Sequence, residues 1–181
     1  MFDMAGLAEK LDAMKDKQYK IREELKKVER RMKTLDEQIR HSGNFKGYRA
    51  HKAQYDKLYG QYETIKKSGG FGAERKAQKA LDAANTYYEA NRMELTLYEA
   101  AERYLRGVLQ ERFNDKKLPP VSKWQAEREN LTVEKKRLDV EYSKLWHETA
   151  TLETIKRSVD DILREETVTP QRTRKHDIEL E

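Results

Sequence analysis

The feature that most constrains the fold is the stretch from Leu118 to Glu166, which carries one apolar stripe with helical spacing. Pro119 and Pro120 end whatever precedes it, and neither Gly nor Pro then occurs before Pro170. The stripe lies on a pattern of alternating four- and three-residue steps, with some steps skipped: Trp124, Leu131, Leu138, Tyr142, Leu145, Leu152, Val159 and Leu163. This spacing predicts a helix of about 44 residues, about 65 Å long. Because a single apolar stripe must be covered in water, the helix needs partner helices.

The N-terminal part of the chain carries a second, more regular apolar pattern. Ten positions follow steps of four and three, and all except Gln18 are apolar: Leu7, Leu11, Met14, Gln18, Ile21, Leu25, Val28, Met32, Leu35 and Ile39. A pattern of more than about four heptads predicts a coiled-coil helix. A lone polar seam residue either fixes the register and the partner or is merely tolerated. The sequence leaves both interpretations of Gln18 open.

Two glycine-containing segments are expected to interrupt the next part of the chain. His41–Gly47 predicts a break after the first helix, with Gly43 as the residue that ends it. The following segment, Tyr48–Lys67, would then fold back as the second arm of an antiparallel hairpin. Ser68–Gly72 predicts a flexible link.

Ala73 to Phe113 predicts a third helical region, with a kink or break at Asn91 and a broad apolar face from Leu95 to Leu109 that we expect to be the most deeply buried. No alternating strand pattern occurs, so we expect an all-α fold, an elongated helical bundle with long coiled-coil helices. Its expected parts are a coiled-coil hairpin over residues 1–67 with a basic, Tyr-rich second helix, a helical bundle over 73–166 that contains the long C-terminal helix, and a flexible tail over 167–181.

Composition narrows the class of protein. Charged residues make up 39% of the chain and hydrophobic residues 36%, so we expect a thin core along helix seams. The absence of Cys excludes disulfides, thiolate metal sites and a Cys nucleophile, and it fits the reducing cytoplasm, where we place the protein. No apolar run approaches the ~18 residues of a membrane span. The acidic start of the chain lacks the basic region of a secretory signal.

The sequence contains no motif of a known catalytic or metal site. The four histidines, His41, His51, His147 and His176, lack metal-ligand spacing. The glycines do not form a phosphate-binding loop, and no Ser stands in a nucleophile elbow. We therefore expect a binding protein with no catalytic residues, no metal and no cofactor.

Positive charge is concentrated in one segment. The net charge is +5, and residues 40–67 hold seven Lys and Arg against two Asp and Glu. Tyrosines alternate with these cations, and such a pattern favours contacts with a nucleic-acid backbone that are strongly salt-dependent and not base-specific. The candidate nucleic-acid-binding residues are Lys46, Tyr48, Arg49, Lys52, Tyr55, Lys57, Lys66 and Lys67. The alternative interpretation is a solvated basic face opposite a Tyr-rich seam.

Several stretches resemble a known family. MELTLYEAAERYL (93–105), KKLPPVSKWQAERENLTVEKKRLDVEYSKL (116–145) and LETIKRSVDDILREE (152–166) are similar to the C-terminal helical region of relaxase/mobilization proteins in Firmicutes mobile elements, and AERKAQKALDAANTYYEANR (73–92) fits the same region. Relaxases nick DNA through an N-terminal domain that we expect this chain to lack, so the resemblance carries the nicking activity over to no residue here. The resemblance implies a non-enzymatic DNA- and protein-binding factor of a bacterial mobile genetic element.

Two other functions fit a small helical protein of such an element. One is an anti-CRISPR inhibitor that binds a type II RNA-guided effector nuclease and blocks cleavage of target DNA. The other is a structural coiled-coil scaffold. The expected protein partner is accordingly a nuclease or the mobilization machinery. The Leu7–Ile39 seam would serve either an intramolecular hairpin or a homo-oligomer, and the sequence leaves both open.

Overall fold

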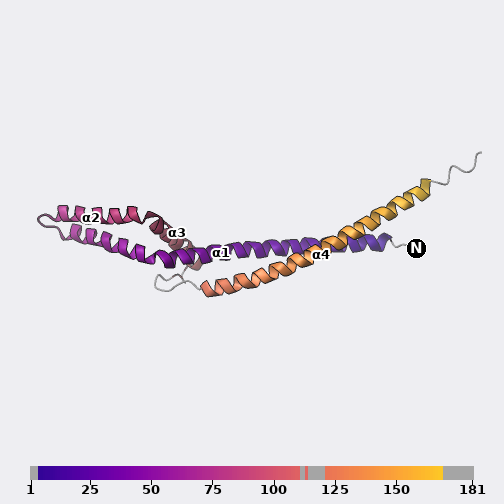
Figure 1. Cartoon of the computed structure of the whole chain (residues 1–181), viewed down its shortest axis with the longest axis horizontal. Helices are drawn as coiled ribbons and strands as arrows, with labels where there is room; N and C mark the ends of the chain where they lie inside the picture. Colours follow the sequence, from indigo (N-terminus) through magenta and orange to yellow (C-terminus); the bar gives the residue numbers. More distant parts are fainter. Residues whose placement is uncertain (1–3, 111–112, 114–120, 169–181) are drawn as a thin grey trace, which may run out of the picture. The chain divides into compact units, whose positions relative to one another are not determined.

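The computed structural model describes residues 4–110, 113 and 121–168. They form four helices: α1 (Met4–Ser68), α2 (Ala73–Ala90), α3 (Arg92–Leu109) and α4 (Val121–Val168) (Figure 1). No strand occurs among these described residues, which confirms the predicted all-α fold. Residues 169–181 of the predicted tail lie outside the described part of the chain, and Thr167 and Val168 are the last residues of α4.

The chain divides into two compact units, and α1 and α4 contribute to both. The coil unit contains residues 4–30 of α1 and 131–168 of α4. The hairpin unit contains residues 31–68 of α1, all of α2 and α3, and residues 121–130 of α4. Each unit is described by itself below.

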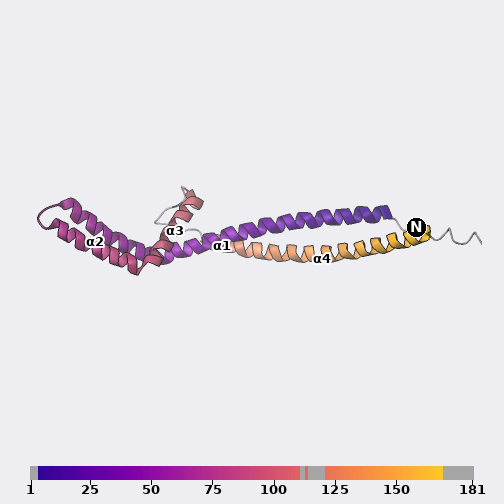
Figure 2. The ribbon, with the colours of Figure 1, turned by 90° about the horizontal axis from the view of Figure 1, so that it is seen from above.

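In the coil unit, α1 and α4 form an antiparallel pair. Lys15 pairs with Glu153 and, further along α1, Glu29 pairs with Lys135, both at 2.7 Å between nitrogen and oxygen. The partner numbers fall as those on α1 rise, so the two helices run in opposite directions, side by side (Figure 2). The predicted long helix is confirmed as the 48-residue α4.

The core of the coil unit is a thin seam, as the composition predicts. On α1, Leu11, Met14, Ile21 and Val28 are buried. On α4, Leu138 is buried and Leu163, near the helix end, is exposed. The other apolar residues of the predicted stripe in this unit are half-buried: Leu131, Tyr142, Leu145, Leu152 and Val159. A pair of two helices leaves the edges of many seam residues in contact with water.

Gln18, the polar member of the seam, has specific partners on α4. Its Nε2 donates to the backbone oxygen of Leu145 at 3.2 Å and to Oγ1 of Thr149 at 2.8 Å. Thr149 is itself buried, with 5% of its surface exposed. A buried polar pair is satisfied in one alignment of the helices, so these bonds favour the register-fixing interpretation of Gln18. Because α4 of the same chain covers this seam, a homo-oligomer through it would require α4 to leave.

The predicted helix break at His41–Gly47 is wrong, because α1 is continuous from Met4 to Ser68. The reason is packing in the hairpin unit. Phe45 is fully buried and stacks on Tyr98 of α3 at 5.0 Å between ring centroids, and Ser42 beside it is also buried. Burial of an aromatic ring outweighs the roughly 1 kcal/mol that each helical Gly costs relative to Ala.

The hairpin predicted over residues 1–67 is therefore wrong as well, and a different hairpin exists. α1 turns at residues 69–72 into α2, which runs back beside it (Figures 1 and 2). His51 Nδ1 lies 3.1 Å from the Tyr87 hydroxyl, and Tyr55 packs on Tyr88 at 5.6 Å. The predicted flexible link is thus the turn between these two helices.

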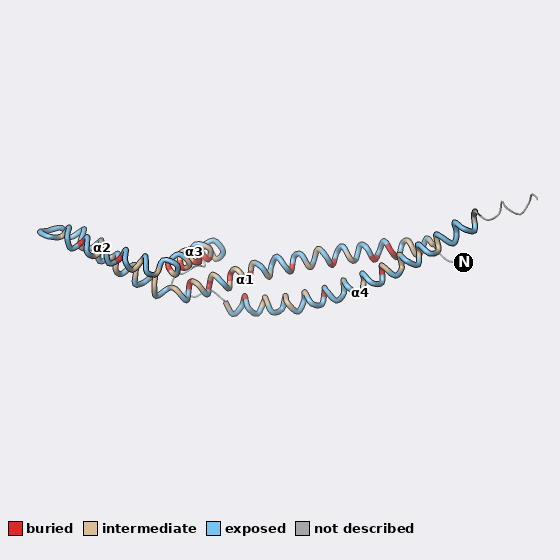
Figure 3. Tube along the Cα trace, turned by 45° about the horizontal axis from the view of Figure 1, so that its top comes forward, coloured by how far each residue is buried: buried red, intermediate tan, exposed pale blue. Residues whose placement is uncertain are grey.

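α3 supplies the best-buried surface of the hairpin unit, as predicted. Four of its residues are buried (Leu95, Tyr98, Ala101 and Leu105), and Figure 3 shows red segments along this helix. Val108, expected on the same face, is 39% exposed. Asn91 separates α2 from α3, as its predicted kink requires, and its side chain donates to the Tyr87 carbonyl at 2.9 Å.

Candidate nucleic-acid interface

The candidate site lies on the part of α1 that belongs to the hairpin unit. One side of this segment faces the neighbouring helices, and its residues are half-buried: His51, Tyr55, Leu58, Tyr62 and Ile65. With 3.6 residues per turn, the residues between them are directed to the opposite, solvent side of α1. The predicted cations therefore divide according to the side of the helix on which they lie.

Four predicted cations lie on the solvent side. Lys46, Arg49, Lys57 and Lys67 are all exposed, and we call them the basic face. Lys46 and Lys57 are about three turns apart, and Arg49 and Lys67 are about five turns apart, so each pair is nearly aligned along the helix. Within the described part of the chain, none of the four makes an ion pair. The row extends over about 32 Å of helix at 1.5 Å per residue.

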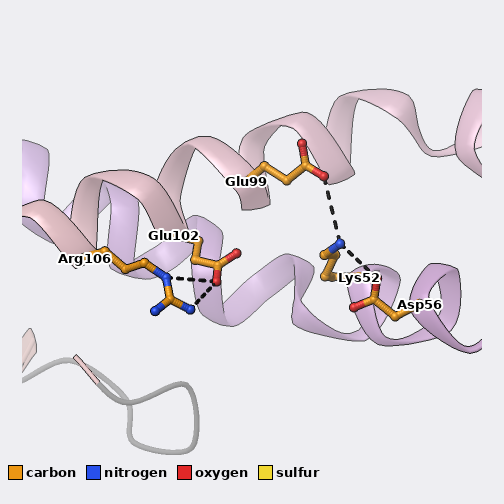
Figure 4. A network of polar contacts seen from close by, with 5 residues as sticks. All are labelled: Lys52, Asp56, Glu99, Glu102 and Arg106. Carbon is orange, nitrogen blue, oxygen red and sulfur yellow. Dashed lines mark hydrogen bonds and ion pairs between the residues drawn. The ribbon is translucent and has the colours of Figure 1, made fainter.

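Lys52 is committed to contacts within the protein. Its ammonium donates to Asp56 Oδ1 at 2.9 Å and lies 4.0 Å from Glu99 Oε1 on α3 (Figure 4). Burial alone would lower the pKa of Lys52, but the hydrogen bond to Asp56 and the charges of Asp56, Glu99 and Glu102 raise it. Glu102 is in turn paired with Arg106 at 2.7 Å. Lys52 therefore ties α1 to α3 and does not belong to the basic face.

The predicted tyrosines take part in packing. Tyr55 stacks on Tyr59 at 6.0 Å, and Tyr59 contacts Tyr62 at 5.5 Å, which gives a ladder of rings along α1. Lys52 lies over the ring of Tyr55 and Lys66 over that of Tyr62, each at 5.5 Å.

A further contact of Lys66 and a raised pKa of Tyr55 also fit this packing role. Lys66 also donates to the Tyr62 hydroxyl at 3.2 Å. Burial raises the pKa of Tyr55. Tyr48 is half-buried and lies against His51. Of the eight predicted site residues, the structure thus brings four cations together on the outer face.

Sequence reasoning missed two features beside the predicted site. Arg75, Lys76 and Lys79 on the first turns of α2 are exposed and add cations next to the end of α1. Phe71 in the turn is fully exposed. A phenylalanine between glycines, followed by a basic helix start, is visible in the sequence, but its position beside Lys67 depends on the hairpin that the structure reveals.

A buried polar cluster lies further along α1, towards α3. Gln38 and Ser42 are buried, and the Gln38 Oε1, His41 Nδ1 and Ser42 Oγ atoms have no hydrogen-bond partner. The His41 ring stacks on Tyr104 at 4.2 Å. Burial lowers the pKa of His41, the charge of Arg40 lowers it further, and Glu37 opposes both. This cluster is part of the helix packing.

Among residues 4–110, 113 and 121–168, no group of three or more His, Asp or Glu side chains lies close enough together to hold a metal ion. None of the helices in the same part of the chain is both long enough and apolar enough to cross a bilayer.

Comparison with known proteins yields no relatives: no family model matches the chain, and no curated protein and no solved structure matches it either.

Proposed function

We propose that this protein acts by binding and that the basic face of α1 contacts the phosphate backbone of a nucleic acid. The observation that supports this proposal is a row of four exposed cations, Lys46, Arg49, Lys57 and Lys67, without ion pairs among the described residues. What sets this segment apart is its charge balance, because residues 40–67 hold seven Lys and Arg against two Asp and Glu. An excess of exposed cations along one face gives that face a positive potential, which attracts a polyanion.

The chemistry of this face fits phosphates better than bases. Each cation that neutralises a phosphate releases condensed counterions, which makes binding favourable and salt-dependent. Three of the four are lysines, whose ammonium groups act as point charges without the planar fork that reads a base edge. The face would therefore bind in a sequence-independent manner. DNA is the nucleic acid that the resemblance to relaxase helical regions favours, and the protein would then act as a DNA- and protein-binding factor of a mobile genetic element.

The test is a charge-matched comparison of two fourfold variants. In the first, Lys46, Arg49, Lys57 and Lys67 are replaced by Ala. In the second, four exposed lysines of the coil unit are replaced by Ala: Lys10, Lys17, Lys20 and Lys27. Both variants lose the same charge, so general attraction to DNA falls equally. Binding to a labelled duplex is measured by fluorescence anisotropy at two salt concentrations.

We expect the basic-face variant to lose at least about tenfold in affinity at low salt, and its slope of log K against log salt to fall by up to about 3.6, because each phosphate contact contributes about 0.9. The coil-unit variant should keep most of its affinity and most of its salt dependence. Equal losses in the two variants, or no binding by the unmodified protein, would contradict the proposal.

A further inference from the structure

The turn between α1 and α2 presents a single side chain to solvent. Residues 69–72 read Gly-Gly-Phe-Gly, and all three glycines have positive φ: 62° at Gly69, 104° at Gly70 and 77° at Gly72. The turn is closed by a hydrogen bond of 3.1 Å from the Ala73 N–H to the Gly70 carbonyl. Because L side chains disfavour these backbone angles, the glycines shape the turn and leave Phe71 as its only bulky group.

Phe71 is the most exposed large apolar side chain of the described residues, with a relative exposure of 110%. A single exposed apolar residue needs no explanation by itself. Its surroundings distinguish it. Between residues 66 and 79 the chain has five basic residues and one acid, Glu74, and all five cations are exposed: Lys66, Lys67, Arg75, Lys76 and Lys79. The exposed Phe71 ring is thus flanked in sequence by five exposed cations, at the end of the basic face.

The other aromatic rings near the turn are already in use. Tyr55, Tyr59 and Tyr62 stack on one another, and lysines lie over the two outer rings of this ladder. Phe71 is therefore the ring whose face is free. A free ring with cations around it is the arrangement by which proteins bind unpaired nucleotides: the cations hold the backbone and the ring stacks on a base.

We propose that Phe71 stacks on an unpaired base, so that the α1–α2 turn directs the protein to single-stranded or gapped DNA. This inference rests on the proposed function, because the basic face supplies the backbone contacts that hold the strand beside the turn. Paired bases are already stacked on both sides, and the ring therefore gains little on an intact duplex. Phe carries no hydrogen-bonding group, so the contact tolerates any base sequence.

An anionic membrane surface is the competing partner for a basic, aromatic turn. The turn offers it one apolar side chain, flanked by glycines that add no apolar area to insert. The cations also continue along one helix face for about 32 Å, a linear array that suits a linear polyanion. Nucleic acid is therefore the partner that the arrangement favours.

The experiment compares three forms of the full chain: unmodified, Phe71→Ala and Phe71→Trp. The probes are a labelled duplex, the same duplex with a single-stranded gap, and vesicles that contain an anionic phospholipid. Met93→Ala is the matched control, because Met93 is also apolar and 65% exposed in the hairpin unit but lies outside the turn. Circular dichroism verifies that each variant keeps its helix content.

We expect the unmodified protein to bind the gapped duplex about tenfold more tightly than the intact one, within the range of one stacked base. Phe71→Ala should abolish that preference and leave affinity for the intact duplex unchanged, while Phe71→Trp and Met93→Ala should retain it. If Phe71→Ala binds every DNA probe as the unmodified protein does, or weakens binding to both duplexes equally, this inference is overturned and the proposed function stands. Binding to vesicles but not to DNA would overturn both.

Discussion

The two units of this protein contain parts of the same helix, α1, but differ in the balance of charge along it: residues 4–30 hold eight Lys and Arg against six Asp and Glu, whereas residues 31–68 hold nine against four. In the coil unit, two cations meet acids on the neighbouring helix, in Lys15–Glu153 and Lys135–Glu29. In the hairpin unit, the outer face of α1 carries Lys46, Arg49, Lys57 and Lys67 with no ion pairs among the described residues. Paired surface charges suit register and solubility, whereas unpaired ones suit a polyanionic ligand.

The cores differ as well. The coil unit has a seam of aliphatic residues, many of them half-buried, with a polar member, Gln18, that bonds Leu145 and Thr149 of α4. The hairpin unit packs aromatic rings, with Phe45 at its centre between Tyr98 and Phe113. We therefore expect the stability of the coil unit to depend on the register between α1 and α4, and the stability of the hairpin unit to depend on the packing of its aromatic rings. The predictions below test that contrast.

The largest effect is expected at Phe45. Phe45→Ala removes a fully buried ring and should lower the free energy of unfolding by about 3–5 kcal/mol. Leu152→Ala, at a half-buried position of the coil unit, should cost about 2 kcal/mol or less, because water already reaches its edges. Urea denaturation followed by circular dichroism measures both. Equal costs would remove the distinction between the two cores.

Glycine substitutions test the continuity of α1. Gly43→Ala and Gly47→Ala should each stabilise the protein by about 1 kcal/mol, because both are helical and nothing lies within 4 Å of an added Cβ. Gly72→Ala is the control: its φ is 77°, and Ala there should destabilise by about 1 kcal/mol. Denaturation midpoints report all three. A destabilising Gly43→Ala would mean that the helix ends at Gly43 after all.

Register in the coil unit can be tested with engineered cysteines, since the chain has none of its own. Lys15→Cys with Glu153→Cys replaces side chains whose ends meet at 2.7 Å, so a short bis-maleimide that bridges the two shorter Cys side chains should give a cross-link within one chain. Glu29→Cys with Glu153→Cys combines positions that are out of register, and this pair should give no cross-link. Adding Gln18→Leu should change the free energy of unfolding by about 1 kcal/mol or less and lower the yield of the in-register product. A cross-linked dimer from the first pair would show that the seam joins two copies.

The smallest expected effect is a pH dependence from His41. Its pKa is lowered in the folded protein by burial and by Arg40, against an opposing charge from Glu37, while its ring stacks on the uncharged Tyr104. The unfolded chain then binds more protons, so the stabilisation is present above about pH 6.5 and is lost as the pH falls. His41→Phe should flatten the change in denaturation midpoint between about pH 7.5 and pH 5.5. His147→Gln, at an exposed position, should not, and an unchanged profile in His41→Phe would contradict the assignment.

Helix identity and the buried seam could be predicted because they depend on local periodicity. The apolar stripe of α4 and the seam from Leu7 to Ile39 both lie on helices, as their spacing predicts. The break at His41–Gly47 could not be rejected from local sequence, because its glycines weaken a helix and the compensating contact, Phe45 on Tyr98, joins residues far apart in the chain.

The candidate site could likewise be predicted from the sequence only in part. That residues 46–67 carry an exposed basic face follows from composition and helical spacing. That Lys52 is tied to Glu99, and that Tyr55 packs on Tyr88, depends on where α2 and α3 lie. The exposure of Phe71 follows from the turn between α1 and α2 that the predicted link, Ser68–Gly72, forms.

The central claim is that nucleic acid lies against the outer face of α1 in the hairpin unit, and site-specific photo-cross-linking tests it most directly. Ala53 is exposed on that face, seven residues after Lys46 and four before Lys57, and Ala13 is an equally small, exposed position in the coil unit. Each is replaced by Cys and labelled with a photoreactive maleimide in the presence of labelled DNA. We predict strong cross-linking from Ala53→Cys and little from Ala13→Cys. Equal cross-linking from both, or stronger cross-linking from Ala13→Cys, would contradict the account.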